Sequence, residues 1–470
     1  MQKFDLVVIG GGSAGLKAAR TAARMGRTVA LAEERELGGE CFWAGCVPTK
    51  AMVRAAQVWH LVRRAHEFGM QVDICRAEFA DAMAYKARAV RRVAGDGPED
   101  GGLSKLGASY FPARARFEGP HEVRIGQEVI RGQQILLATG TVPAVPPIPG
   151  LVETGFITNR EAVSLETLPR RLVVLGAGPI GLEFAQVFRR FGAEVTVIEQ
   201  GAQILPREDE EIAALVALFL REEGIRILTN ATAASVSAIQ SDGSKTRRVR
   251  VRQGNATQDI ECEEILVATG RNAALEGLQI EAAGVAFNAK RVEIDPYLRT
   301  SVPHIWAAGD VTGGYLFTHV ASYEGKLAAL NAFTDKLEPF DDRVVPRATF
   351  VDPEVASIGL TERQAHEQGL RVRTHAFSFA DLDRAILHGD ARGLVKLVVD
   401  ERDGQILGAH LTGPDASSVI AELAICMKSH LPVSAIADTM HAYPSFPEAV
   451  EAAALSAPNY RGQVEGATSP

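Results

Sequence analysis

Two cysteines five positions apart, Cys41 and Cys46, stand in "GGECFWAGCVPTK" (38–50). Such cysteines can pack in a hydrophobic core, bind a metal, form a structural disulfide or take part in redox chemistry. A zinc site needs four ligands, and neither a second cysteine pair nor a histidine cluster supplies the other two, so we expect no metal. The residues from Cys46 onward are typical of a helix, whose N-terminus favours a thiolate. Sulfurs near one helical turn apart also fit the geometry of a disulfide.

A glycine pattern that can hold a nucleotide comes before the cysteines. "FDLVVI" predicts a buried strand, Gly10, Gly12 and Gly15 form G-x-G-x-x-G, and a helix is expected to about Met25. The second strand, "TVALA", ends at Glu33. The order strand, turn, helix, strand is that of a dinucleotide-binding unit.

The same pattern returns in the middle of the chain. "RLVVL" precedes Gly176, Gly178 and Gly181, and "EVTVI" ends at Glu199. In both copies the acidic residue lies 23 positions after the first glycine (33 − 10 and 199 − 176). The first glycine permits the tight turn, the second lets the backbone approach a pyrophosphate, and the third lets the helix pack on the strand. The carboxylate accepts hydrogen bonds from a ribose.

Each copy of the pattern ends with a similar predicted strand, so the sequence predicts two dinucleotide-binding sites. "ILLATG" contains Thr139 and Gly140, and "ILVATG" ends at Gly270. Glu199 favours NAD over NADP, because a carboxylate repels a 2′-phosphate and no arginine immediately replaces it.

These patterns predict an α/β protein with two Rossmann-like dinucleotide-binding domains and a C-terminal α+β domain. The first domain is expected over 1–150, completed by 276–345, and the second over 151–275. Hairpin-like alternation followed by helices predicts the third domain over 346–470, ending in a mobile tail, "NYRGQVEGATSP".

The composition limits which binding partners and which cellular compartment we expect. A net charge of −8 over 470 residues argues against nucleic acid, and no apolar run is long enough to span a membrane. The N-terminus lacks a signal-peptide pattern and there are only five cysteines, so we expect a cytoplasmic protein. Cys75, Cys262 and Cys426 are isolated and are expected to be small buried hydrophobes.

The whole set of motifs, in this order, resembles the class I pyridine nucleotide–disulfide oxidoreductases, the family of dihydrolipoyl dehydrogenase, glutathione reductase and mercuric reductase. The resemblance rests on the first glycine motif, C-x-x-x-x-C, the second glycine motif, "ATGRNA" and "AAGD". It implies FAD in the first site, NAD in the second, a C-terminal dimerisation domain, a homodimer, and a dithiol or disulfide substrate such as a lipoyl group.

The resemblance also implies residue roles. Cys46 would be the thiolate beside the flavin and Cys41 the interchange thiol that attacks the substrate. Lys50 would lie near the flavin and pair with Glu183. The remaining cofactor contacts that it implies, beyond the two glycine motifs and their acids, are Gly39, Thr139, Gly140, Gly270, Asp310 and His319 of "FTHVASYEG".

One segment departs from the family pattern. Disulfide-reducing members carry a His-Pro near the C-terminus, with a glutamate a few residues on, and the histidine is the general acid/base. In "HAYPSFPEAVE", Tyr443 takes the place of the histidine and Glu448 that of the glutamate, while His441 stands two residues early. Tyrosine, with a pKa near 10, is a poor base at neutral pH.

Three hypotheses therefore remain open. The first is an FAD- and NAD-dependent dithiol/disulfide oxidoreductase similar to dihydrolipoyl dehydrogenase. The second is a mercuric-reductase-like enzyme that reduces a soft metal ion or another electrophile, because a tyrosine at this position resembles mercuric reductases. The third is a redox-responsive flavoprotein interaction module. Trp43, between the two sulfurs, either shapes the substrate pocket or packs against a neighbouring helix.

Overall fold

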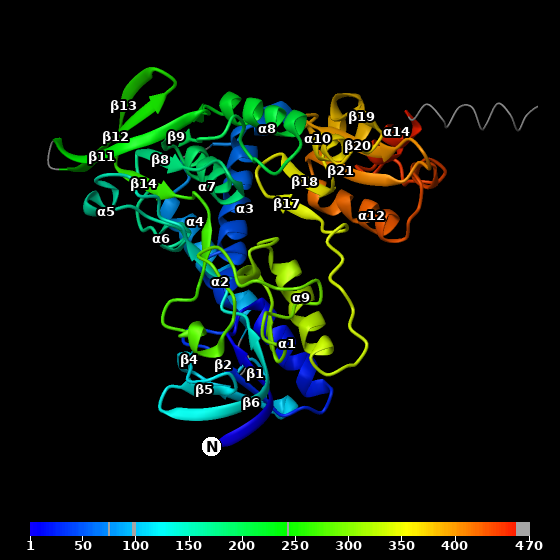
Figure 1. Ribbon diagram of the computed structural model, residues 1–470. Coiled ribbons are helices and arrows are strands. Elements are labelled where there is room, and N and C mark those ends of the chain that lie inside the picture. Colours follow the sequence, from blue (N-terminus) through cyan, green and yellow to red (C-terminus); the bar gives the residue numbers. More distant parts are fainter. Residues whose placement is uncertain (74–75, 96–99, 242–243, 457–470) are drawn as a thin grey trace, which may run out of the picture.

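The computed structural model describes residues 1–470 except 74–75, 96–99, 242–243 and 457–470 (Figure 1). Cys75 and the expected C-terminal tail lie outside the described residues. The described residues form three larger sheets with their own helices and two smaller β units between or beside them. The predicted α/β class is confirmed, whereas the domain boundaries stay a prediction.

The first sheet holds the first glycine motif. Its strand order is β3 (Ser109–Phe111), β2 (Val29–Ala32), β1 (Gln2–Ile9), β6 (Glu128–Leu137), β5 (Glu122–Ile125) and β4 (Ala115–Phe117). β16 (Ile305–Ala307) pairs in parallel with β6, so a distant part of the chain returns to this sheet. β1, β2, β3 and β6 run parallel, with Val7 level with Ala30 and Ile135. The helices α1 (Ser13–Arg24) and α9 (Thr318–Asn331) lie together beside this sheet (Figure 1).

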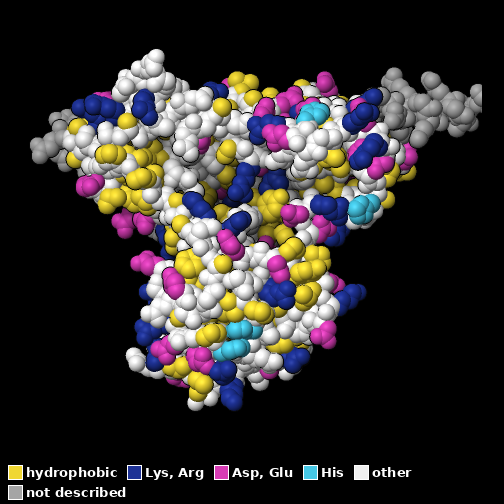
Figure 2. All heavy atoms as spheres, in the orientation of Figure 1, with side chains coloured by type: hydrophobic (Ala, Val, Ile, Leu, Met, Phe, Trp, Pro, Cys, Tyr) yellow, Lys and Arg dark blue, Asp and Glu magenta, His cyan; other side chains and the backbone are white. Residues whose placement is uncertain are grey.

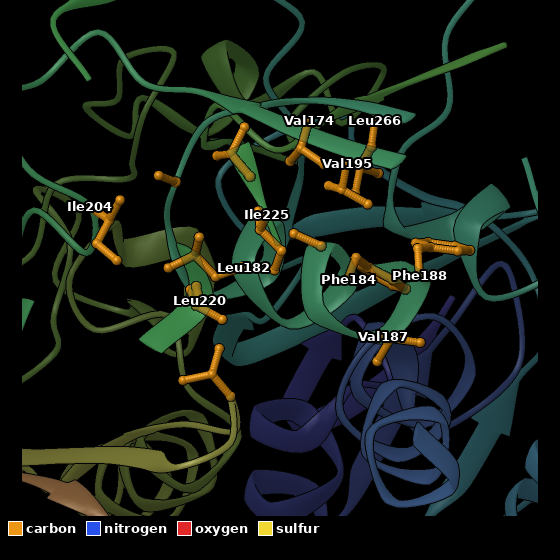
Figure 3. Packing of buried hydrophobic residues seen from close by; sticks show 14 of the residues in the cluster. Val174, Leu182, Phe184, Val187, Phe188, Val195, Ile204, Leu220, Ile225 and Leu266 are labelled. Atoms are coloured by element: carbon orange, nitrogen blue, oxygen red, sulfur yellow. The ribbon is translucent and has the colours of Figure 1, made fainter. Parts of the chain in front are cut away.

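The second sheet repeats this plan with four parallel strands. Their order is β10 (Arg226–Leu228), β9 (Glu194–Ile198), β8 (Arg171–Leu175) and β14 (Glu264–Val267). The helices α7 (Pro179–Arg190) and α8 (Glu210–Glu222) belong to this unit. Phe184 and Phe188 of α7 pack with Val174, Val195 and Leu266 of the strands in one buried cluster (Figure 3). An antiparallel sheet of β11 (Ala231–Ser241), β12 (Ser244–Gln253) and β13 (Ala256–Cys262) projects from one side.

The elements between the two large sheets carry the cysteines. α2 (Gly39–Trp43) contains Cys41, and α3 (Cys46–Arg63) begins with Cys46 and is followed by α4 (Phe79–Ala94). A ribbon of β7 (Thr141–Pro143) and β15 (Arg271–Ala273) pairs the segment leaving the first sheet with the segment leaving the second. The short helices α5 (Leu151–Thr154) and α6 (Asn159–Ala162) follow β7.

The C-terminal part is an antiparallel sheet covered by helices, as expected for an α+β domain. Its strand order is β17 (Arg347–Thr349), β18 (Glu354–Gly359), β21 (Ile406–Gly413), β20 (Leu394–Asp400) and β19 (Val372–Ser378). Its helices are α10 (Glu362–Glu367), α11 (Asp383–His388), α12 (Ala416–Lys428), α13 (Val433–Ala437) and α14 (Glu448–Leu455).

The surface and the isolated cysteines complete the description. Acidic and basic side chains are interspersed over the described part of the face in Figure 2. Among the described residues, no helix has the length and apolar character needed to cross a membrane. Cys262 is buried as predicted, but the prediction for Cys426 is wrong, because this side chain on α12 is only half-buried.

Candidate redox site

The first glycine motif has the shape that a pyrophosphate requires. Gly10 has a φ of +107°, and a Cβ added there would lie 2.3 Å from the carbonyl oxygen of Ala138. A Cβ on Gly15 would lie 1.8 Å from the carbonyl oxygen of Gly10, so α1 packs on the turn only with glycine there. A Cβ on Gly12 would meet no described heavy atom within 4 Å. That open backbone at a helix N-terminus suits a phosphate.

The second motif repeats these features. Gly176 has a φ of +99°, and its Cβ would lie 2.5 Å from the carbonyl oxygen of Ala268. A Cβ on Gly181 would lie 2.2 Å from the carbonyl oxygen of Gly176, and one on Gly178 would have no described neighbour within 4 Å. The two turns therefore share one design, although they belong to separate sheets.

The two predicted acids occupy matching positions. Glu33 Oε2 accepts a hydrogen bond of 2.6 Å from the backbone N–H of Gly11, and Glu199 Oε2 accepts one of 2.8 Å from that of Ala177. The other carboxylate oxygen of Glu199 accepts from the N–H of Gly201 at 2.7 Å. Each acid is thus fixed at the end of the second strand of its motif, beside the glycine turn.

Further groups expected around the first nucleotide also fit a bound cofactor. Gly39 has a φ of +61°, and a Cβ there would lie 3.0 Å from Cα of Gly12. The buried hydroxyl of Thr139 has no hydrogen-bond partner among the described residues, as expected of a group that bonds a ligand. Gly140 and Gly270 both have positive φ and open space at the Cβ position. These residues fit FAD in the first site and a nicotinamide nucleotide in the second.

Asp310 and His319 differ in their surroundings. Asp310 is reached by the hydroxyl of Thr141 at 3.3 Å, and burial raises the pKa of its carboxyl. His319 is exposed, and its Nε2 donates to the carbonyl oxygen of Pro346 at 2.8 Å. Asp310 therefore has the burial expected of a cofactor contact, whereas His319 is already bonded to the backbone.

The two cysteines are not joined by a disulfide and act on each other's pKa. The neighbouring Cys41 thiol lowers the pKa of Cys46 to about 6, and Cys46 raises the pKa of Cys41. The hydroxyl of Thr318 lies 3.3 Å from the Cys46 sulfur and also lowers its pKa. Cys46 is thus the thiolate of the pair at neutral pH.

The sequence did not identify Thr318 as a partner of the thiol. Thr318 belongs to "FTHVASYEG", in which the resemblance points only to His319. It lies 272 positions from Cys46, and nothing local in the sequence connects the two.

Lys50 and Glu183 meet one turn beyond Cys46. Lys50 Nζ donates to both oxygens of the Glu183 carboxylate, at 3.0 and 2.8 Å, and the Glu183 side chain is only 4% exposed. The backbone N–H of Phe350 donates to the same carboxylate at 2.9 Å. Helix α3, helix α7 and the start of the C-terminal domain therefore converge on one ion pair, and Glu183 is no surface carboxylate.

Tyr443, Glu448 and His441, the predicted catalytic residues near the C-terminus, are far in the sequence from the Lys50–Glu183 ion pair. Tyr443 is 72% exposed, and its hydroxyl donates to Asp383 at 2.9 Å, which raises the pKa of the phenol. Glu448 accepts from the backbone N–H of Ser445 at 2.6 Å. The Tyr443 phenol thus lies against a carboxylate of α11.

His441 is enclosed within the C-terminal domain. Its side chain is 7% exposed, with Nε2 3.2 Å from Glu422 and Nδ1 3.2 Å from Glu451. Nδ1 also lies 2.9 Å from the carbonyl oxygen of Thr439, so both ring nitrogens have oxygen atoms beside them. Trp43 is 41% exposed and donates from Nε1 to the carbonyl oxygen of Leu37 at 3.0 Å, so it is held by its own loop.

Comparison with known proteins identifies the family. Residues 4–325 match the family model "Pyridine nucleotide-disulphide oxidoreductase", and residues 345–454 match its dimerisation domain. The chain therefore belongs to the pyridine nucleotide–disulfide oxidoreductases, a family of flavoproteins that use FAD and NAD(P). The dimerisation domain supports a homodimer.

Named relatives include two activities. A dihydrolipoyl dehydrogenase from Chlamydia muridarum is 36% identical, over 97% of both chains. A mercuric reductase from Bacillus cereus is 33% identical, over 96% of this chain and 71% of its own.

A solved structure shares the whole fold. The HOCl-induced flavoprotein disulfide reductase RclA from Escherichia coli matches with a TM-score of 0.84 and 32% identity, covering 96% of this chain and 99% of its own. A Cu(II) complex of RclA matches with a TM-score of 0.83 and 32% identity, over 95% of this chain and 98% of that chain.

Proposed function

We propose that the protein is an NAD-linked flavoenzyme that exchanges electrons between a nicotinamide and a dithiol or disulfide through Cys41 and Cys46, as dihydrolipoyl dehydrogenase does. The observation that carries the proposal is the thiol–thiolate pair, with Cys46 ionised beside Thr318 and the Lys50–Glu183 ion pair one turn away. FAD, when bound, supplies the two-electron carrier between NADH and the pair. Gly10, Gly12, Gly15, Glu33, Gly39, Thr139, Gly140 and Asp310 are the residues that would hold it.

The sulfur chemistry can be written from this chain's own groups. Cys41, once deprotonated, attacks one sulfur of a substrate disulfide, forms a mixed disulfide and releases one substrate thiolate. Cys46 then attacks the Cys41 sulfur, closes the Cys41–Cys46 disulfide and releases the second substrate thiolate. The pair loses two electrons and the proton of Cys41, and the substrate gains two electrons; its two thiolates are then protonated by the proton from Cys41 and by one from solvent. The reverse sequence oxidises a dithiol.

The low pKa of Cys46 supports the second of these steps. A thiolate, and not a thiol, is the attacking species, and Cys46 is ionised at neutral pH. Cys41 has a raised pKa because its proton is shared with Cys46. Its activation therefore requires that this proton be transferred to a base.

The position of Glu199 supports NAD as the nucleotide. Both of its oxygens are held by backbone N–H groups at the end of β9. A fixed carboxylate there repels the additional phosphate of NADP and accepts a ribose hydroxyl.

A second candidate substrate is a thiophilic metal ion, which would be bound and reduced as substrate. The observation that favours it is Tyr443, which stands where disulfide-reducing members carry the histidine base and whose phenol is bonded to Asp383. A metal ion accepts electrons from a thiolate pair without a proton to the leaving group. Relatives named mercuric reductase and the Cu(II) complex of RclA are consistent with this alternative. No specific observation favours the redox-responsive interaction module.

Replacement of Cys41 by serine tests the proposal. We expect Cys41→Ser to abolish NADH-driven reduction of lipoamide, while NADH still bleaches the flavin absorbance. Cys426→Ser, a half-buried cysteine on α12, is the matched control and should retain activity. If lipoamide reduction survived in Cys41→Ser, Cys41 would not be the interchange thiol. If the unaltered enzyme reduced Cu(II) or Hg(II) but not lipoamide, the second candidate would replace the first.

A further inference from the structure

The helix that carries Cys41 has no hydrophobic anchor. None of the five residues of α2 is buried, and the helix follows Gly38 and Gly39, whose φ angles are +102° and +61°. A helix of this length is not stable by itself, because too few hydrogen bonds offset the cost of ordering it. Bonds from neighbouring elements must therefore fix its position.

Those bonds converge on Glu40, the residue before Cys41. Its carboxylate accepts from Arg160 Nη2 at 2.5 Å and from Asn159 Nδ2 at 2.7 Å, and Arg271 Nη2 lies 3.4 Å away. Two guanidinium groups thus face one carboxylate. The amide of Asn159, a buried side chain, also donates to the carbonyl oxygen of Ala44 at 2.8 Å. Asn159 therefore forms hydrogen bonds with α2 both near its beginning and at its C-cap.

The partners of Glu40 lie about 120 to 230 positions later in the chain. Asn159 and Arg160 lie in α6, and Ile157 just before it bridges to Leu266 of the second sheet. Arg271 lies in β15, and its guanidinium also donates to the hydroxyl and the carbonyl oxygen of Thr141, at 2.6 and 2.9 Å. The position of α2 is thus set from the nucleotide-binding unit that follows it.

We propose that Glu40 is a positioning residue for the dithiol, which holds α2 against Arg160, Asn159 and Arg271 so that the Cys41 thiol points at the Cys46 sulfur. The inference rests on the redox role proposed above for this pair. Without these contacts, α2 can rotate about Gly38 and Gly39, and Cys41 moves away from Cys46. The Cys41 side chain is the largest influence lowering the pKa of Cys46, so that pKa reports on the position of α2.

The test is the pH profile of alkylation in the FAD-loaded protein, reduced with a phosphine so that the nicotinamide half plays no part. Iodoacetamide is added from pH 5 to 9, and the rate at each cysteine is read by peptide mass spectrometry. The wild-type pair is expected to react with an apparent pKa near 6. Glu40→Ala should raise that apparent pKa by at least about one unit, which lowers the rate at pH 6.5 about threefold.

Three further variants separate positioning from a general loss of structure. Glu40→Gln retains an acceptor oxygen and should give a smaller rise, and Arg160→Met should reproduce part of the Glu40→Ala effect. Glu36→Ala removes an exposed carboxylate from the same loop and should leave the profile unchanged.

Two results would count against the inference, and they differ in meaning. If Glu40→Ala or Glu40→Gln bound FAD and retained the wild-type profile, Glu40 would not position the dithiol, while the redox role of the pair would stand. If the wild-type protein had no cysteine reacting below pH 8, the thiolate of the proposed function would be absent, and the inference would fall with it.

Discussion

The hydroxyl of Thr318 is expected to set part of the reduction potential of the cysteine pair. It lies 3.3 Å from the Cys46 sulfur, and Cys46 is the thiolate of the pair, with a pKa of about 6. Thr318→Val replaces the hydroxyl by a methyl group of similar size and removes one hydrogen bond to the thiolate. Since a bond to a charged group contributes roughly 1.5–3 kcal/mol and this one is long, we take about 1.4 kcal/mol, or about one pKa unit.

The change in potential follows from that magnitude. At pH 7, raising the pKa of Cys46 from about 6 to about 7 removes about 1 kcal/mol of thiolate stabilisation from the reduced pair. A two-electron couple changes by about 30 mV for each 1.4 kcal/mol, so the potential of Thr318→Val should be about 20 mV more negative. The sign is negative because the substitution destabilises the reduced form.

The assay is equilibration with glutathione buffers of known ratio, followed by acid quenching, alkylation and mass measurement of the dithiol and disulfide forms. Thr318→Ser retains the hydroxyl and should keep the wild-type potential. If Thr318→Val also kept it, or became less negative, the hydroxyl would not stabilise the Cys46 thiolate and the assignment of this bond would be refuted.

Three other predictions follow from buried charges. Lys50→Met should raise the pKa of Cys46 and Glu183→Gln should lower it, because Lys50 favours and Glu183 opposes the thiolate; equal shifts in one direction would contradict this. Glu199→Gln should reduce the preference for NADH over NADPH in steady-state kinetics about tenfold, and an unchanged ratio would show that this carboxylate does not discriminate. Burial lowers the pKa of His410 below 6.5, so on acidification this histidine binds a proton in the unfolded chain before it does so in the folded protein. Stability is therefore lost as the pH falls through 6.5. His410→Asn should flatten this part of a Tm–pH profile, and an unchanged slope would show that His410 does not cause the loss.

The sequence predicted the parts of the fold that repeat a local pattern. The strand "RLVVL" is β8, residue for residue, and "EVTVI" is β9. The two glycine motifs could be recognised because the third glycine of each meets a local steric demand: a Cβ on Gly15 would contact the carbonyl oxygen of Gly10, five positions earlier. The spacing of Glu33 and Glu199 reflects the length of one helix and one strand.

The missed features depend on contacts between distant residues. None of the residues of helix α2 is buried, and the helix is held by side chains about 120 to 230 positions later, so no periodicity revealed it. The approach of Thr318 to Cys46 likewise joins two ends of the first domain. For His441, the residue type suggested a substitute base, but burial between Glu422 and Glu451 depends on how α12 and α14 pack.

Anaerobic mixing of the oxidised enzyme with dihydrolipoamide and NAD⁺ tests the central claim most directly. Flavin absorbance and NADH formation are followed together, with Cys41→Ser as the blank. Rapid bleaching of the flavin followed by NADH formation is the predicted result, since electrons would enter at Cys41 and leave through the nucleotide site. Full reduction by NADH with none by dihydrolipoamide would contradict dithiol chemistry at this pair and would direct the search to metal ions and other electrophiles.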